Sequence, residues 1–288
     1  MKRFATMLAS AMDSFSEDRC WTFSAAISYY TVFSLPWILL IVVHIAGWIV
    51  GNQAAVGEIH NRIQSVAGSA VAQQIETMLQ NASQPGGHGL LADLIGIAVI
   101  IVSSTSAFAE FQFALNQAWE VEPGNSWRAF AVKRLISFLM VVGIGIILIA
   151  LMALRTVLST IGLATSFPFS EFWQMLLAWI ALTVLVGAIF RVLPDARIAW
   201  QDVGASAVLT ATLLTLSKYG MSVYLAHSSV ATSFGAAGSL AIILLWLYTS
   251  SLILLFGAEF ARAWSRFHGR DVVPEKGAVR VAIEKRAA

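Results

Sequence analysis

The chain has 288 residues, of which 58% are hydrophobic and only 12% are charged, and its formal net charge is +2. Soluble globular proteins carry charge on about 25% of their residues, so this composition excludes an ordinary soluble enzyme and predicts apolar surface that faces lipid. The net charge is small, and the basic residues are spread over several segments. They therefore do not form the single basic stripe that is typical of a nucleic-acid-binding protein.

The amino-terminal segment 1–20 mixes charged and apolar residues without a continuous apolar core, so we expect no cleaved signal peptide. An apolar stripe at helical spacing is formed by Phe4, Leu8, Met12 and Phe15. The stripe predicts an amphipathic helix that either lies on the membrane surface or docks on the protein's own helices. Cys20 is the only cysteine, which excludes an intramolecular disulfide and indicates a small apolar core residue.

A first membrane span is predicted from Ala25 toward Gly51, and Pro36 interrupts it. Proline has no N–H and crowds the carbonyl of Val32, so we expect a kink there. The interval 52–89 is the longest polar stretch of the chain. Its apolar residues recur every three or four positions, which predicts an extracytoplasmic amphipathic helix.

Five further apolar stretches are long enough to cross a membrane. They lie at about 90–108, 135–154 and 172–190, in a stretch that begins after Asp202, and at 238–257. Asp202 is a reasonable N-cap for the fifth of the six predicted spans, which carries Lys218 well inside its length.

The basic residues fix the expected orientation. With the amino terminus inside, every Lys and Arg except Arg62, Arg155 and Lys218 falls on the cytoplasmic side. The sequence therefore predicts an all-α, polytopic transmembrane helix bundle with about six spans, plus the amphipathic N-terminal helix and the extracytoplasmic amphipathic helix. The expected domains are the helix 1–20, the membrane domain 21–264 and a basic cytoplasmic tail 265–288. Both termini are expected in the cytoplasm of a bacterium, with the bundle in its inner (plasma) membrane.

Catalytic signatures are missing from the sequence. The five histidines have no metal-binding spacing, and no phosphate-binding loop, dinucleotide-binding glycine motif or nucleophile elbow occurs. We therefore expect no enzyme, no metal and no cofactor.

Ionisable residues at membrane depth are the stronger functional signal, because a charge in hydrocarbon costs about 3 kcal/mol on insertion scales. Lys218 is the best candidate, and the alternatives are a structural pair with a carboxylate or snorkelling to the interface. Glu259 has Arg262 three residues on, as in a helical ion pair at the interface. Glu110 and Asn116 face either the bundle or the headgroups, and Pro36 completes the candidate set.

Several segments together resemble the YihY/BrkB family of bacterial inner-membrane proteins. These segments are 25–36, 111–119, 193–196, 235–240, 245–248 and 255–259, within residues 20 to 262. The resemblance implies a six-helix inner-membrane protein, and family members have carried virulence-factor or ribonuclease labels. The chain departs from the family pattern at Phe234, where a tyrosine is expected before Gly235.

The predicted function is transport, or facilitated movement, of a lipid or small solute in the cell envelope. The alternative is a non-transporting scaffold that recruits partners through residues 53–80 and the basic tail, and a third reading is a ribonuclease. Cleaving RNA needs a metal or acid–base centre, which the sequence lacks. The expected partners are membrane lipids and a lipid or small-molecule substrate, with no nucleic acid. The oligomeric state is left open.

Overall fold

The computed structural model describes residues 2–34, 106–122, 170–227, 236–270, 272–275 and 278–280, together with eight isolated positions at 57, 60, 64, 72, 73, 76, 77 and 132. The helices are α1 (Lys2–Glu17), α7 (Ser170–Val192), α8 (Trp200–His227) and α10 (Ala236–Phe267), with helical segments 20–34 and 106–118. The strands are β1 (Val121–Glu122), β2 (Ala196–Arg197), β3 (Val273–Pro274) and β4 (Val279–Arg280).

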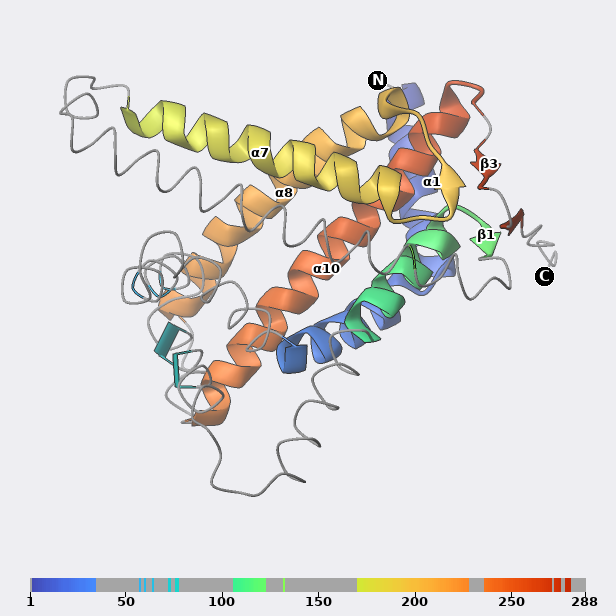
Figure 1. Cartoon of the computed structure of the whole chain (residues 1–288). Helices are drawn as coiled ribbons and strands as arrows, with labels where there is room; N and C mark the ends of the chain where they lie inside the picture. Colours follow the sequence, from blue (N-terminus) through green and yellow to red (C-terminus); the bar gives the residue numbers. More distant parts are fainter. Residues whose placement is uncertain are drawn as a thin grey trace, which may run out of the picture.

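Helix α8 packs against both α7 and α10, and α1 lies against the other side of α10 (Figure 1). The core between them is made of fully or almost fully buried apolar residues. It includes Leu115, Val186, Phe190, Val203, Ala207, Leu255 and Ala258. At Gly257 the helices approach so closely that a Cβ atom would overlap Thr210 Oγ1 and lie 3.0 Å from the Phe190 ring. This contact fixes the level at which α8 and α10 cross.

Helix α1 docks on the bundle. Met7, Ala11 and Phe15 are buried, and Met7 and Ala11 pack with Phe260 of α10. Of the predicted stripe Phe15 is buried, whereas Leu8 and Met12 are 39% and 51% exposed, so the prediction is wrong for these two residues. The buried line is set by Ala11, whose small side chain lets the two helices approach; a pattern of large apolar residues cannot show this.

Two helices in the described part of the chain are long and apolar enough to cross a membrane, at Met175–Val192 and Leu240–Phe267. They coincide with the fourth and sixth predicted spans, but α10 continues ten residues past Gly257, the expected end of the sixth. Where the fifth span was expected, α8 is a 28-residue helix, but it is not one of these two helices. It begins at Trp200, so the expectation that Asp202 is the N-cap is wrong and this residue lies in the first turn.

Several predictions fall on other parts of the chain. The third predicted span, most of the first two and Pro36 lie outside the described residues. Within 52–89 the seven described positions are all helical, and His60 Nδ1 lies 2.8 Å from Glu76 Oε2.

The segment after α10 folds back over the connections between helices. Strand β3 pairs antiparallel with β2, and β4 pairs antiparallel with β1. The Glu275 N–H also donates to the Asp195 carbonyl at 2.9 Å. Residues 272–275 thus pair with the turn between α7 and α8, and residues 278–280 pair with the turn after helix 106–118. An all-α prediction does not contain this long-range pairing.

Candidate functional site

Helix α10 ends in three charged residues on one face. Glu259, Arg262 and Arg266 are three and four residues apart, so they line up along the helix. Glu259 Oε2 lies 3.7 Å from Arg262 Nη1, which realises the ion pair that the sequence predicts. Glu259 is only 1% exposed and Arg262 only 8%, so the pair is buried between helices, whereas the sequence suggested the membrane interface.

Arg262 donates hydrogen bonds to acceptors in two other parts of the chain. Its Nη1 donates to Asp18 Oδ2 at 3.3 Å and to the Ala118 carbonyl at 3.0 Å, and its Nη2 donates to Glu120 Oε1. Glu120 also accepts from Arg266 Nη2 at 2.6 Å. We name the group of Asp18, Cys20, Glu120, Glu259, Arg262 and Arg266 the Arg262 cluster.

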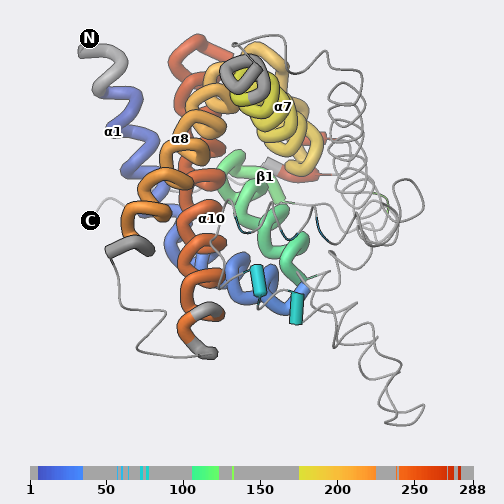
Figure 2. Tube along the Cα trace, turned by 90° about the vertical axis from the view of Figure 1, so that its left-hand side faces the viewer, coloured from blue at the N-terminus to red at the C-terminus, as the bar shows by residue number. Residues whose placement is uncertain are grey.

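Tight turns bring these partners to α10. Asp18 follows the last residue of α1, and Glu120 lies two residues after helix 106–118 ends. The neighbouring Arg19 and Glu120 itself have φ values of 53° and 52°, the left-handed conformation that often ends a helix. In Figure 2 the amino-terminal segments, the green helix and α10 lie close together around this point.

Cys20 forms the innermost part of the cluster. It is 1% exposed, and its thiol points to Glu259 Oε1 at 3.9 Å. Burial raises the pKa of the Cys20 thiol, and the nearby negative charges of Glu259 and Asp18 add to this effect. The thiol is therefore neutral and unreactive in the folded protein. The sequence prediction of a small core residue is right about its burial, but it missed the polar contact.

The cluster brings three carboxyl groups together with two guanidinium groups. Three carboxylates, from Asp18, Glu120 and Glu259, meet the guanidinium groups of Arg262 and Arg266. Five buried side-chain atoms of the described residues have no hydrogen-bond partner, and Glu259 Oε2 in this cluster is one of them. Such groups are uncommon in protein interiors, where a buried polar atom without a hydrogen bond costs about 1–3 kcal/mol.

A second polar contact secures the neighbouring turn. Asn116 is 3% exposed, and its side chain donates to Asp195 Oδ2 at 2.6 Å while its Oδ1 accepts from the Asp195 N–H at 2.7 Å. Gln112 also donates to Asp195 Oδ2, at 3.1 Å. The amide of Asn116 therefore binds both the backbone and the side chain of Asp195. Farther along, Arg270 binds Asp202 Oδ1 at 3.1 Å in the first turn of α8.

A model of the family described as "Virulence factor BrkB" matches residues 11–280. The chain belongs to this family. Its relatives named UPF0761 membrane protein include one from Alcanivorax borkumensis, 24% identical, with 90% of this chain and 60% of the relative covered. One from Stenotrophomonas maltophilia has the same identity and the same shares, and one from Mannheimia succiniciproducens is 21% identical, with 85% and 84% covered. The chain spans between 48% and 60% of the length of the first three relatives. No solved structure matches it.

Membership of the BrkB family agrees with the resemblance inferred from the sequence, and it establishes a membrane protein. The segments of this chain that resemble the family also contain residues of the polar contacts described above. Asn116 lies in the segment 111–119, Asp195 in 193–196 and Glu259 in 255–259.

The predicted site residues do not converge. Asn116 and Glu259 lie in the polar contacts at one end of the bundle, whereas Lys218 lies toward the other end of α8, half-buried. Since α8 and α10 run antiparallel and cross at Thr210 and Gly257, Lys218 is about 15 Å from Glu259 along the helices. Glu110 is half-buried and makes no hydrogen bond or ion pair with another described residue.

Sequence reasoning missed Asp18, Cys20, Glu120 and Asp195 as site residues. Their contacts span between 79 and 244 positions of sequence, so no local pattern reveals them. In the structure Asp18 and Glu120 follow helix ends at residues 17 and 118, where a charged side chain can reach a neighbouring helix. The predicted helix 1–20 and the predicted span 90–108 did not place helix ends at these positions.

Proposed function

We propose that this BrkB-family protein is a multi-pass transporter or facilitator that moves a lipid or small solute in the bacterial inner membrane. The observation that carries the proposal is Lys218, a half-buried cation inside an otherwise mostly apolar helix that makes no ion pair with another described residue. Charges at membrane depth are expensive, and those that face the protein interior mark substrate or ion pathways.

The contacts among turns support six crossings with both termini in the cytoplasm. Arg262 binds Asp18 and Glu120, Asn116 binds Asp195, and Arg270 binds Asp202. These contacts favour a common side of the membrane for the four regions around 18, 120, 195–202 and 262–270. The chain then crosses an even number of times between successive regions, and two crossings in each interval agree with the six predicted spans. The excess of Lys and Arg in these regions favours the cytoplasm.

The sequence holds no nucleotide-binding motif, so the proposal is a facilitator or an ion-coupled carrier without its own ATPase or cofactor. Within the described residues no group of His, Cys, Asp and Glu is arranged to hold a metal ion. We assign no catalytic step to the protein.

The test uses purified protein in liposomes of bacterial lipid that contain a fluorescent phosphatidylglycerol. Dithionite bleaches only the outer leaflet, so lipid movement raises the bleached fraction; uptake of labelled solutes is measured in parallel. We expect Lys218→Met to lower the rate at least tenfold, with Lys218→Arg as the control that keeps the charge. Wild-type rates in a folded Lys218→Met protein would remove the basis of the proposal.

A scaffold role is the second candidate, and the Arg262 cluster favours it. Arg262 is paired by three carboxyl groups of the chain itself, so these groups hold helices together. Under this alternative, substitution of Lys218 leaves cellular activity unchanged, while replacement of residues 53–80 by a flexible linker abolishes it. Measuring both variants in cells that depend on the protein separates the two functions.

A further inference from the structure

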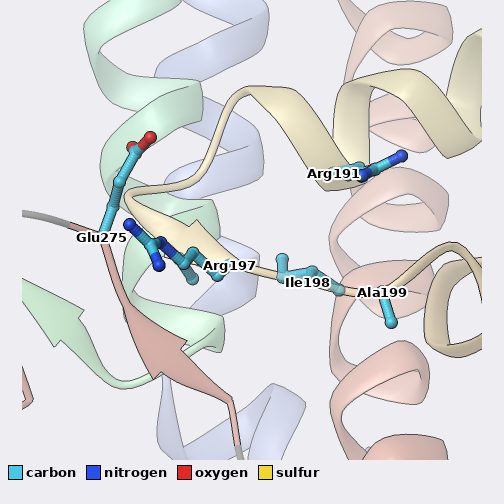
Figure 3. Close-up of a pocket in the computed structure, with 6 residues that line it drawn as sticks. Arg191, Arg197, Ile198, Ala199 and Glu275 are labelled. Carbon is cyan, nitrogen blue, oxygen red and sulfur yellow. The ribbon is translucent and has the colours of Figure 1, made fainter.

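A cavity of about 420 Å³ opens at the connection between α7 and α8. It is lined by Arg191, Ala196, Arg197, Ile198, Ala199 and Glu275. Figure 3 shows Arg191 at the end of α7, above Ala199, and Arg197 on β2, beyond Ile198 and beside Glu275, with the two side chains pointing away from each other. Two guanidinium groups therefore border the cavity at separate points.

The cavity lies at the depth of lipid headgroups. The apolar stretch of α7 ends at Val192, the residue next to Arg191. Arg191 lies over the ring of Trp200, with its guanidinium carbon 4.6 Å from the ring centroid, and this tryptophan is 51% exposed. Tryptophan is enriched where hydrocarbon meets the headgroups, so the pair places the cavity at that boundary.

The arginines of the cavity differ from those nearby. Arg262, Arg266 and Arg270 each bind a carboxylate of the chain. Arg191 and Arg197 form no ion pair with another described residue, although Arg191 contacts Trp200 through the face of its guanidinium group. The edge of that group still carries its N–H donors.

The lining attracts anions. Two guanidinium groups against the single carboxylate of Glu275 leave an excess positive charge. The first residue of α8 follows directly after Ala199, and the partial positive charge of a helix N-terminus adds to the field. Guanidinium is well matched to phosphate oxygens, which it binds with two parallel hydrogen bonds.

We propose that this cavity binds the phosphate of an anionic phospholipid, with Arg197 as the hydrogen-bond donor and Arg191 supplying positive charge at the other end of the cavity. The exposed apolar surface of α7 favours a lipid over a free anion, because Val184 is 61% and Val192 is 39% exposed on the helix that leads to the cavity. The acyl chains lie along this surface while the headgroup is held at the arginines. The site is independent of transport, since it needs only that α7 spans the bilayer.

The test measures lipid binding by native mass spectrometry of the detergent-purified protein with added phosphatidylglycerol or phosphatidylcholine. We expect phosphatidylglycerol to bind preferentially, and Arg197→Gln to weaken it roughly tenfold, the size of a lost charged hydrogen bond. Arg19→Gln is the matched control, because Arg19 is also exposed and the charge change is identical.

Three results would overturn the proposal. Arg197→Gln could bind phosphatidylglycerol as the wild type does, or Arg19→Gln could weaken binding equally, which would mean a general charge effect. Inorganic phosphate at millimolar concentration could displace the lipid, which would mean a site for the free anion.

Discussion

Replacing Arg262 by methionine removes the one cation that all three carboxylates of its cluster contact. Methionine keeps much of the apolar volume of the side chain, so the main effect is electrostatic. Asp18 and Glu259 are 7% and 1% exposed, and water cannot replace the guanidinium there. The Ala118 carbonyl loses its donor as well.

The expected loss is large because a buried charge is left without its partner, which costs about 3–5 kcal/mol. For a protein of this size each kcal/mol lowers the melting temperature by about 2–4 °C, so Arg262→Met is expected to melt about 10 °C or more below the wild type. Arg266→Met is the matched control, since Arg266 also binds Glu120 but its side chain is 51% exposed. An exposed pair contributes about 1 kcal/mol or less.

The chain supplies its own reporter for this assay. Cys20 is the only cysteine and is buried inside the cluster, so a thiol-reactive fluorescent dye reads its exposure as the detergent-solubilised protein is heated. Glu259→Gln combined with Arg262→Met removes one uncompensated carboxylate and is expected to recover part of the loss. The reasoning fails if Arg262→Met melts within about 3 °C of the wild type, or if Arg266→Met costs as much.

Three further predictions concern single contacts. Gly257→Ala places a methyl group on Thr210 and is expected to cost about 1–3 kcal/mol in thermal unfolding, with recovery in the double variant that carries Thr210→Ala. Full stability of Gly257→Ala would contradict the close crossing. Asn116→Asp sets two carboxylates against each other at Asp195, so we expect a lower melting temperature at pH 7 that rises toward the wild type at pH 5, where one carboxylate is protonated; a loss independent of pH would point to steric disruption. Because burial raises the pKa of the Cys20 thiol above its ordinary value of 9.0, only the unfolded chain ionises there as the pH passes 9. Stability should therefore fall from pH 9 to 10 by tryptophan fluorescence, and Cys20→Ala should lose that part of the pH dependence.

The sequence predicted α7 and α10 well, because local composition alone specifies these two helices. The apolar runs of α7 and α10 are continuous in the sequence, and their length sets the helices almost regardless of context. The end of α10 was placed too early because charged residues such as Arg262 looked like the edge of a span. In the structure the helix continues, since its charges are paired by other segments.

The amino-acid sequence by itself determined that this is a helical membrane protein, where two helices long and apolar enough to cross a membrane lie, and that it resembles the BrkB family, because hydropathy and charge act over short windows of the chain. Only the tertiary structure decided which face of α1 is buried, that Asp18 and Glu120 meet Arg262, and that the carboxyl-terminal residues pair with distant turns. These features depend on which helices become neighbours. That choice is made by close approach at small residues such as Ala11 and Gly257 and by the pairing of charges far apart in sequence.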